Sequence, residues 1–260
     1  MNKIRMCPVC QGRKRTKLNI LDGFEICKCR SCKHVFVNNI TQDTSSSLDV
    51  TTKDVDITAT HFRHHMIVSL IENKFPELNT NSDEIINCAE IGSGIGRLGY
   101  LLLGKKTLKY CGFEPSFERY AYSKQYNVNV KNETFKEDAG NYDVIIMDNV
   151  LEHVANPAEV FKSVSKSLKK GGIFINIVPN RHDIRRFFPK FRDKHFWLPR
   201  WHINYFSMND LKYLSKLNGM SIHDFGLDTI GHGNNYLKIK TLLDNFGIHV
   251  GGLYTYAIKL

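Results

Sequence analysis

Residues 90–96, EIGSGIG, decide the fold. They follow an apolar run at 85–89, IINCA, that is typical of a buried strand, and they precede the helical stretch RLGYLLL at 97–103. Glycines tolerate positive φ and let a ligand approach the backbone closely, and the amino terminus of a following helix adds a favourable dipole. The stretch therefore predicts a strand–loop–helix unit whose loop holds a nucleotide-type ligand.

The spacing of the glycines narrows the class of ligand. A dinucleotide fingerprint requires its third glycine at position 97, where this chain has Arg97. The GxGxG loop instead suits a ligand without a pyrophosphate. Glu114 ends the next predicted strand, in GFEPS, where an ionised carboxylate is placed to accept hydrogen bonds from both hydroxyls of a ribose.

From residue 61 onward, helical and strand-like patterns alternate, which predicts a doubly wound α/β sheet with ligands at the carboxyl ends of its strands. We expect seven strands, at 85–91, 108–114, 128–131, 143–148, 172–178, 220–227 and 253–260. We expect helices at 61–75, 95–104, 116–126, 157–170, 207–218 and 235–245. Gly171-Gly172 is a helix-stop signal for the fourth helix, and the last two strands predict a finishing hairpin.

Five of the seven cysteines lie in the first 38 residues. Two CxxC knuckles separated by 18 residues have the spacing of a four-thiolate structural zinc site, with the ligands Cys7, Cys10, Cys29 and Cys32. Cys27 is expected to be a spare buried thiol, and Asp22-Gly23 to form the turn of a hairpin between the knuckles. The sequence therefore predicts a small zinc-ribbon-like module at 1–38, a polar linker at 39–60 and a second domain at 61–260.

The composition is that of a soluble globular protein, with 42% hydrophobic and 24% charged residues among 260. No apolar run approaches the ~18 residues that a membrane span requires, and the first residues lack the apolar core of a secretory signal. We therefore expect a cytoplasmic protein without a membrane partner. The sequence leaves the oligomeric state open.

The net charge of +10 comes from two segments. Residues 1–38 carry nine Lys or Arg against two acidic residues, and residues 181–200 carry seven against two. A surface that binds nucleic acid is one explanation. A tetrathiolate zinc would add two negative charges to the first segment and so weaken that explanation.

Five motifs in order carry a family resemblance: EIGSGIG, GFEPS, YDVIIMDNVLEHVANP (142–157), LKKGGIFINIVPN (168–180) and HINYFSMNDLKYLSKLNGM (202–220). Over residues 61–260 they resemble the class I S-adenosylmethionine (SAM)-dependent methyltransferases, in the branch with an LEHV-type signature. The cysteine knuckles resemble the zinc modules that are fused to some members. The resemblance implies a seven-stranded Rossmann-like methyltransferase sheet, with SAM as cofactor.

The resemblance also implies roles for single residues. Glu90 and the loop residues Gly92, Ser93, Gly94 and Gly96 would line the methionine part of SAM, and Glu114 would hold the ribose. Asp148 and Asn149 would supply contacts after the fourth strand. The adenine-side acid stays open among Glu133, Glu137 and Asp138.

A base is needed only if the methyl acceptor must lose a proton, and His153 and His202 are the candidates. His61, His64 and His65 are further histidines near the site, but histidines on a polar helix are commonly exposed. Residues 181–206 interleave cations with aromatics and are expected to form a substrate lid. In this lid Arg185 and Arg186 would clamp a phosphate, and Trp201 would stack on a sugar or base.

Three functions follow. The first is methylation of an anionic small molecule, a phosphorylated or nucleotide-linked acceptor in surface-polysaccharide or natural-product biosynthesis; the resemblance implies O-methylation, and N- or C-methylation stays open. The second is methylation of an rRNA base, with the basic zinc module holding the RNA. The third is a non-catalytic binding module, which the intact glycine loop and Glu114 argue against.

Overall fold

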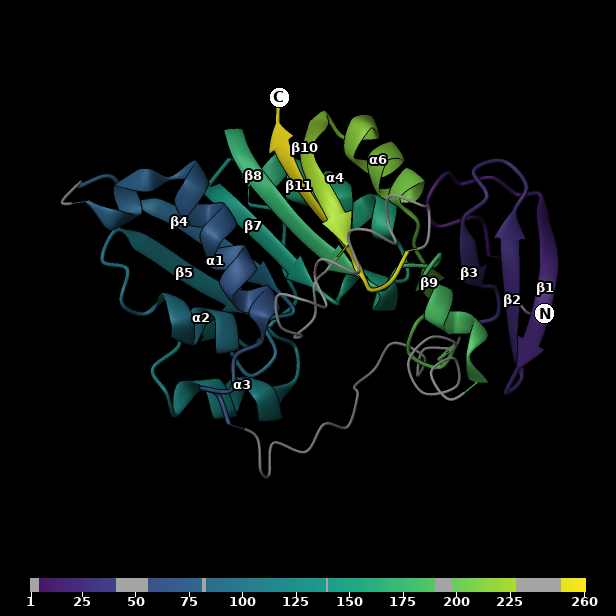
Figure 1. Cartoon of the computed structure of the whole chain (residues 1–260), viewed down its shortest axis with the longest axis horizontal. Coiled ribbons are helices and arrows are strands. Elements are labelled where there is room, and N and C mark those ends of the chain that lie inside the picture. The colour runs from purple at the N-terminus through teal and green to yellow at the C-terminus, as the bar shows by residue number, and fades with distance from the viewer. Residues whose placement is uncertain (1–4, 41–55, 81–82, 139, 190–197, 228–248) are drawn as a thin grey trace.

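Seven apolar segments pair into one mixed sheet (Figure 1). In chain order these strands are β4 (Ile86–Ile91), β5 (Leu108–Phe113), β6 (Val130–Lys131), β7 (Tyr142–Asp148), β8 (Leu168–Val178), β10 (Met220–Leu227) and β11 (Leu253–Lys259). Their order across the sheet is β10-β11-β8-β7-β4-β5-β6. β11 is antiparallel to both of its neighbours, and the strands from β8 to β6 are parallel. The predicted seven-stranded α/β sheet and its finishing hairpin are confirmed.

The structure is a computed structural model that describes residues 5–40, 56–80, 83–138, 140–189, 198–227 and 249–260. Its helices are α1 (Phe62–Lys74), α2 (Arg97–Leu102), α3 (Phe117–Lys124), α4 (Pro157–Ser167) and α6 (Met208–Leu217). Short 3₁₀ turns are η2 (Pro76–Asn79), η3 (Leu151–His153) and η4 (Ile184–Phe187). The helix expected at 235–245 lies outside the described residues. Among the described residues, no helix is long and apolar enough to cross a lipid bilayer.

Both faces of the large sheet are covered by helices. Along β7, Val144 and Ile146 pack with α1 and α2, whereas Ile145 and Met147 pack with α4 and α6. This alternation follows from the period of two in a strand, and the burial of both faces explains why β7 reads as a continuous apolar run. The carboxyl ends of the parallel strands are left open between the two helical layers.

The end of α4 differs from the prediction. The helix ends at Ser167 rather than at residue 170, and β8 begins at once at Leu168. Gly171, with φ of +78°, lies inside β8, at the point where the register between β7 and β8 shifts. The glycine pair that was expected to stop the helix therefore lies at an irregularity of the strand. Glycine is found in β-bulges as well as at helix ends.

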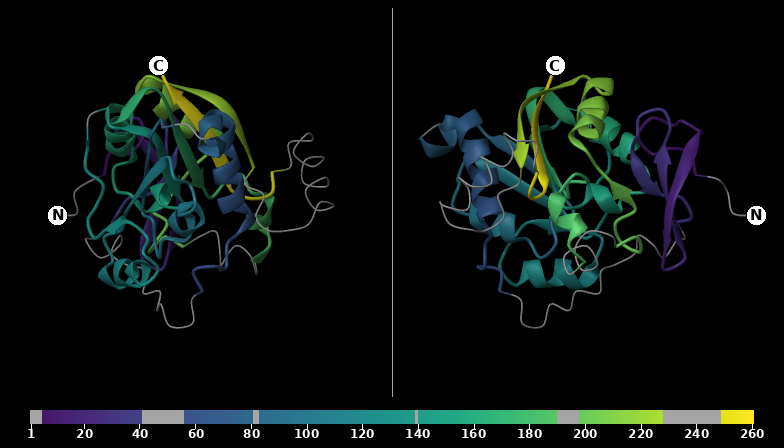
Figure 2. Two further views of the ribbon diagram at one scale, coloured as in Figure 1. Left: turned by 90° about the vertical axis from the view of Figure 1, so that its left-hand side faces the viewer. Right: turned by 45° about the vertical axis from the view of Figure 1, so that its right-hand side comes forward.

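The first residues form a second, smaller sheet. Strands β1 (Arg15–Leu21), β2 (Phe24–Cys29) and β3 (Val35–Val37) pair in antiparallel order, and β9 (Asn204–Tyr205) pairs with β3 at the edge. The predicted hairpin turn is present, since Asp22 and Gly23 both have positive φ, as a type I′ turn requires. Figure 2 shows this sheet beside the large one. Because β9 comes from the far end of the chain, the two parts are joined by strand pairing.

The expected linker at 39–60 is only partly described. Ile57, near its end, is fully buried against Val128 and Val130, and the carbonyl of Asp56 accepts hydrogen bonds from Arg97. The final residues of this segment therefore pack on the domain that follows.

Candidate functional site

A cavity of about 920 Å³ opens at the carboxyl ends of β4, β5 and β7. β4 pairs with β5 on one side and with β7 on the other, so the chain reverses its direction across the sheet at this point. The cavity is within the size range of small-molecule sites. All eight residues predicted to hold a cofactor lie at or beside these strand ends, and seven of them line the cavity: Glu90, Gly92, Ser93, Gly94, Glu114, Asp148 and Asn149.

The glycine loop is shaped by three positive φ angles, of +69° at Gly92, +56° at Gly94 and +86° at Gly96. A Cβ added at Gly92 would lie 2.5 Å from Cγ2 of Val150, so the protein itself occupies that space. A Cβ added at Gly94 would meet no described atom within 4 Å. Gly94 therefore exposes its backbone to the cavity, and Gly96, which lies outside the lining, is the residue from which α2 starts.

Glu114 is held by backbone groups of two elements. One carboxylate oxygen accepts a hydrogen bond from the backbone N–H of Gly94, and the other accepts one from Ser116, each at 2.9 Å. The side chain is 4% exposed. Because β5 delivers Glu114 and β4 delivers the loop, the carboxylate ties the two neighbouring strand ends together and keeps further lone pairs for a ligand.

Two more acids lie close to Glu114. The Tyr110 hydroxyl donates a hydrogen bond to Glu90, and burial raises the pKa of Glu90 to about 8, with further contributions from the negative charges of Asp148 and Glu114. Asp148 accepts a hydrogen bond from Arg63 of α1 at 2.7 Å. Because Glu90 with its raised pKa is mostly protonated at pH 7, the negative charge that a ligand meets here comes from Glu114 and Asp148, and Arg63 offsets part of it.

The contribution of α1 was only partly foreseen. Its buried residues are His64, Ile67 and Ile71, and His64 lines the cavity, whereas His61 and His65 do not. Burial lowers the pKa of His64 to about 4, so this imidazole is neutral at pH 7. The spacing of 64, 67 and 71 is the signal that would have found this face. Nothing in the sequence pairs Arg63 with Asp148, because the two residues are 85 positions apart.

The candidate bases His153 and His202 lie together, but only His153 is among the residues that line the cavity. Their ring centroids are 5.1 Å apart, and His153 lines the cavity beside Trp201. The Nδ1 atom of His153 lies 2.8 Å from the carbonyl oxygen of Trp201. Burial lowers the pKa of both imidazoles, to about 4 for His202, so both are neutral at pH 7.

Beside this histidine pair lies Glu152, which the sequence did not single out. Its side chain is 1% exposed, and burial raises its pKa to about 8. The LEHV motif thus supplies a buried acid as well as a histidine.

The predicted phosphate clamps do not border the cavity. The Nε and Nη2 atoms of Arg185 donate to the carboxylate of Asp183, and Arg186 donates to the carbonyl of Arg181. Local partners thus hold Arg185 and Arg186 in η4, and neither of them is among the residues that line the cavity. Residues 203–206 of the expected lid also belong elsewhere, because they are buried next to the small sheet. Residues 190–197 lie outside the described part.

The adenine-side acids also lie away from the cavity. None of Glu133, Glu137 and Asp138 is among its lining residues, whereas Thr134 and Phe135 are. Glu137 instead pairs with Lys166 at 3.0 Å. This wall of the cavity is therefore aromatic rather than acidic.

Comparison with known families identifies the fold. A family model described as a methyltransferase domain matches residues 60–224, more than half of the chain. The chain belongs to this methyltransferase family. It is an enzyme fold, and the matched residues include the glycine loop and every strand end that borders the cavity.

Solved methyltransferase structures have the same fold at low sequence identity. A putative S-adenosylmethionine-dependent methyltransferase from Listeria monocytogenes is 14% identical, with 76% of this chain and 98% of that chain covered and a TM-score of 0.55. The plantazolicin methyltransferase BpumL, in complex with S-adenosylhomocysteine (SAH), is 17% identical to this chain. The match covers 75% of this chain and 89% of that chain, with a TM-score of 0.51. Phosphoethanolamine N-methyltransferase 2 of Haemonchus contortus, in complex with S-adenosyl-L-methionine, is 13% identical, with 75% and 52% covered and a TM-score of 0.56. No curated protein matches the chain.

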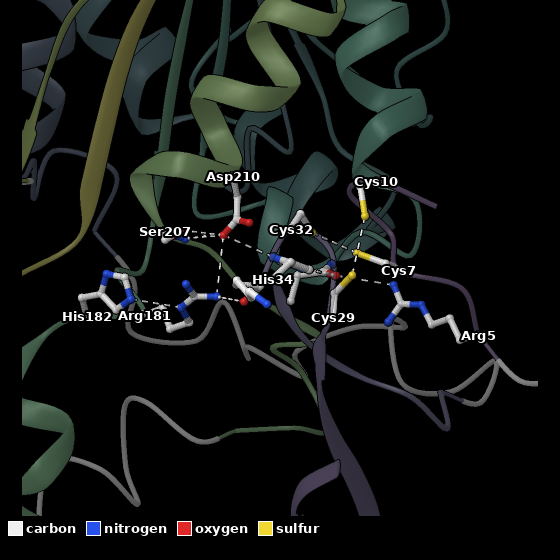
Figure 3. Close-up of polar contacts among 12 residues, drawn as sticks. Arg5, Cys7, Cys10, Cys29, Cys32, His34, Arg181, His182, Ser207 and Asp210 are labelled. Carbon is white, nitrogen blue, oxygen red and sulfur yellow. Dashed lines mark hydrogen bonds and ion pairs between the residues drawn. The ribbon is translucent and has the colours of Figure 1, made fainter. Parts of the chain in front are cut away.

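Outside the methyltransferase cavity, the four knuckle cysteines form one cluster (Figure 3). The Sγ atoms of Cys7 and Cys32 are 3.5 Å apart, those of Cys10 and Cys29 are 3.6 Å apart, and all four lie within 4.8 Å of one another. In each knuckle the residue after the second cysteine has positive φ, 59° at Gln11 and 68° at Lys33. Cys27 is buried but lies outside the cluster, with its thiol on Glu25. It is the spare thiol that the sequence predicted.

Polar contacts fix the cysteine module to the methyltransferase domain (Figure 3). Next to the second knuckle, Nδ1 of His34 lies 3.4 Å from Asp210, at the start of α6. Arg181 donates to the carbonyl of Lys33 at 2.6 Å, and Arg5 donates to the carbonyl of Ala155 at 2.5 Å. The module and the domain are thus docked through buried and half-buried polar groups.

Proposed function

We propose that the protein transfers the methyl group of SAM to an oxygen atom of a small acceptor. The observation that carries this proposal is Glu114, held by the backbone of Gly94 and Ser116 directly beside a glycine loop that opens on the cavity. The two hydroxyl groups of a ribose can each donate a hydrogen bond to such a carboxylate. The loop also lacks the third glycine of the fingerprint that binds a pyrophosphate.

The charge of the cavity fits the same donor. A sulfonium and an α-ammonium group both carry positive charge, and the carboxyl groups of Glu114 and Asp148 line the cavity together with the mostly protonated Glu90. In this proposal Glu90 and the loop residues Gly92, Ser93, Gly94 and Gly96 receive the methionine part, and Asp148 and Asn149 close the site after β7. Phe135 offers an apolar surface for the base.

SAM supplies an activated methyl group with a neutral leaving group, so much of the catalysis can come from positioning the acceptor in line. The chain's own part is to hold the acceptor at the other end of the cavity. There His153 and Trp201 form the wall, with His202 packed against His153. Because His153 lines the cavity and its lowered pKa leaves the imidazole mostly neutral at pH 7, its lone pair is available to an acceptor hydroxyl.

An anionic acceptor is supported by Arg119 rather than by the predicted clamps. Arg119 of α3 lines the cavity, and its positive charge contributes to lowering the pKa of His153. A cation therefore faces the acceptor end. A phosphorylated or nucleotide-linked small molecule fits this arrangement.

RNA is the second candidate substrate, because the small sheet carries a basic hollow. It is lined by Arg13, Lys14, Arg15, Lys17 and Arg30, together with Glu25 and Cys27. Such a cluster can bind a phosphate backbone in a salt-dependent manner.

A comparison of methyl uptake tests the function. SAM with a labelled methyl group is incubated with the protein and either nucleotide-linked sugars or unmodified ribosomal RNA, and label is counted in each acceptor. We expect label in the small molecules alone. Label in RNA, lost on raising the salt, would transfer the assignment to the second candidate. Absence of calorimetric SAH binding would remove the methyltransferase proposal itself.

We also propose that the four cysteines of the cluster bind one structural zinc ion. Four thiolates around one zinc at about 2.3 Å lie about 3.8 Å from one another, close to the observed 3.5 and 3.6 Å, whereas a disulfide requires about 2.05 Å. Elemental analysis should find that the Cys7→Ser/Cys32→Ser double variant holds one zinc per chain fewer than the wild type. A folded wild-type protein without zinc would contradict this site.

A further inference from the structure

Glu152 is a buried carboxylate that has no hydrogen-bond partner among the described residues. It lies in η3, just after the carboxyl end of β7, and its side chain is 1% exposed. Neither carboxylate oxygen makes a hydrogen bond. A buried carboxyl group without hydrogen bonds is costly whether it is charged or neutral, so the two oxygens of Glu152 are left for a partner that the described residues do not provide.

Two imidazoles face this carboxylate. The Nε2 atom of His153 lies 3.8 Å from Oε1 of Glu152, too far for a hydrogen bond. One ligand atom each from Glu152, His153 and His202 can be chosen so that all three lie within 4.8 Å of one another. Such spacing leaves room for one ion between them.

The backbone holds the three residues in this arrangement. Because the Nδ1 atom of His153 lies 2.8 Å from the carbonyl oxygen of Trp201, Nδ1 carries the proton and the lone pair is on Nε2. The segment with His202 is fixed to the same turn, since Ile203 N–H donates to the carbonyl of Glu152 at 2.9 Å. A histidine that donates one ring N–H to a carbonyl while its other nitrogen is free has the arrangement found in metal sites.

We propose that Glu152, His153 and His202 bind a divalent first-row transition cation at the acceptor end of the methyltransferase cavity. Two imidazoles and one carboxylate suit such ions, and three protein ligands leave coordination positions open. His153 lines the cavity, so those positions are accessible to a bound acceptor.

The cation site deepens the proposed function and rests on it for its role. The ion would hold the acceptor's hydroxyl oxygen and lower the pKa of that hydroxyl, so that its proton passes to water. The oxygen's electron pair then forms the new bond to the methyl carbon, and the C–S bond breaks with its electron pair left on sulfur. The two histidines would therefore bind the cation instead of taking the proton.

Manganese binding tests the site without relying on activity. Mn²⁺ is titrated into the full-length, zinc-loaded protein, and the six-line EPR signal of free Mn²⁺ is followed. Mn²⁺ is a suitable probe because it favours oxygen and nitrogen ligands over a four-thiolate site. The variants are Glu152→Gln, which keeps the shape of the buried side chain, and His202→Gln. The matched control is Glu159→Gln, because Glu159 lines the same cavity but is 63% exposed and lies in α4.

We expect the wild type and Glu159→Gln to bind one Mn²⁺ per chain. In Glu152→Gln and His202→Gln the affinity for Mn²⁺ should fall by about tenfold or more. Equal binding by wild type and Glu152→Gln, or an equal loss in Glu159→Gln, would overturn the site. Calorimetric SAH binding in the same samples separates this proposal from the proposed function. Protein that binds SAH but no Mn²⁺ refutes the cation site alone, and protein that binds Mn²⁺ but no SAH supports the cation site and refutes the cofactor assignment.

Discussion

Two buried acids, one after β5 and one after β7, differ in their hydrogen bonding within the described part of the chain. Glu114, after β5, has both oxygens hydrogen-bonded by backbone N–H groups at 2.9 Å. Glu152, after β7, is equally buried, and neither of its oxygens makes a hydrogen bond to a residue that the structure describes. The described residues thus satisfy the carboxylate of Glu114, whereas they leave both oxygens of Glu152 without a partner. The loop end is preorganised, and the histidine end depends on its ligand.

The largest expected effect comes from the glycine loop that supports Glu114. In Gly92→Ala the new methyl group would meet Val150 at 2.5 Å with φ at +69°, so overpacking and backbone strain add to about 3 kcal/mol of lost stability. In Gly94→Ala only the strain remains, about 1 kcal/mol, because no described atom lies within 4 Å of the added Cβ. Urea denaturation measures the loss of stability in both variants.

SAH calorimetry on the same pair sharpens the contrast. Gly94→Ala should stay folded and lose SAH affinity, because its methyl group enters the cavity. A Gly92→Ala variant as stable as Gly94→Ala would show that the loop is not packed as described.

The next effect concerns Glu114 itself. Glu114→Ala removes the charge-assisted acceptor of the ribose hydroxyls, so SAH affinity should fall by roughly tenfold or more. Isothermal titration calorimetry measures this, with Glu159→Gln as the control acid in the same cavity. Unchanged affinity in Glu114→Ala would remove the ribose role and, with it, the main support for the donor.

Glu90 gives a pH-dependent effect. Its pKa is raised by burial from 4.5 to about 8, so the folded protein holds this proton more tightly than the unfolded chain. The resulting stabilisation is complete below pH 4.5 and is lost as the pH rises toward 8, by at most about 1.4 kcal/mol per pH unit. Glu90→Gln cannot lose the proton, so its stability relative to wild type should rise between pH 5.5 and 7.5.

Thermal unfolding without ligand at several pH values measures this difference. Parallel pH profiles for wild type and Glu90→Gln would mean that Glu90 is ionised in the folded state. In that case the cavity would carry more negative charge than described.

The smallest effect is expected for the arginines of η4. Because Arg185 and Arg186 bond to Asp183 and to a backbone carbonyl, away from the cavity, Arg186→Ala should change SAH affinity and the acceptor KM by less than about twofold. Arg119→Ala, which removes a cation that lines the cavity, is the contrasting variant for the acceptor KM. A KM increase in Arg186→Ala alone would restore the predicted clamp.

The sequence correctly predicted the elements that are specified by residues close together along the chain. Strand β10 was predicted at its observed bounds, and β4 and β5 to within one residue, because apolar runs bounded by turn residues specify strands. The end of α4 was wrong, because Gly171 and Gly172 fit a strand irregularity as well as a helix end. Arg185 and Arg186 were placed at the site from charge alone, and charge does not say which neighbour an arginine bonds.

The sequence by itself determined the glycine loop, the acid after β5, the strand order along the chain and the two cysteine knuckles, since each depends on residues a few positions apart. Only the tertiary structure decided that β9 extends the small sheet, that Arg63 bonds Asp148 and that His202 lies against His153 and Glu152. These contacts join residues tens of positions apart, and no local pattern encodes which distant surfaces meet, because that is settled by the packing of the whole core.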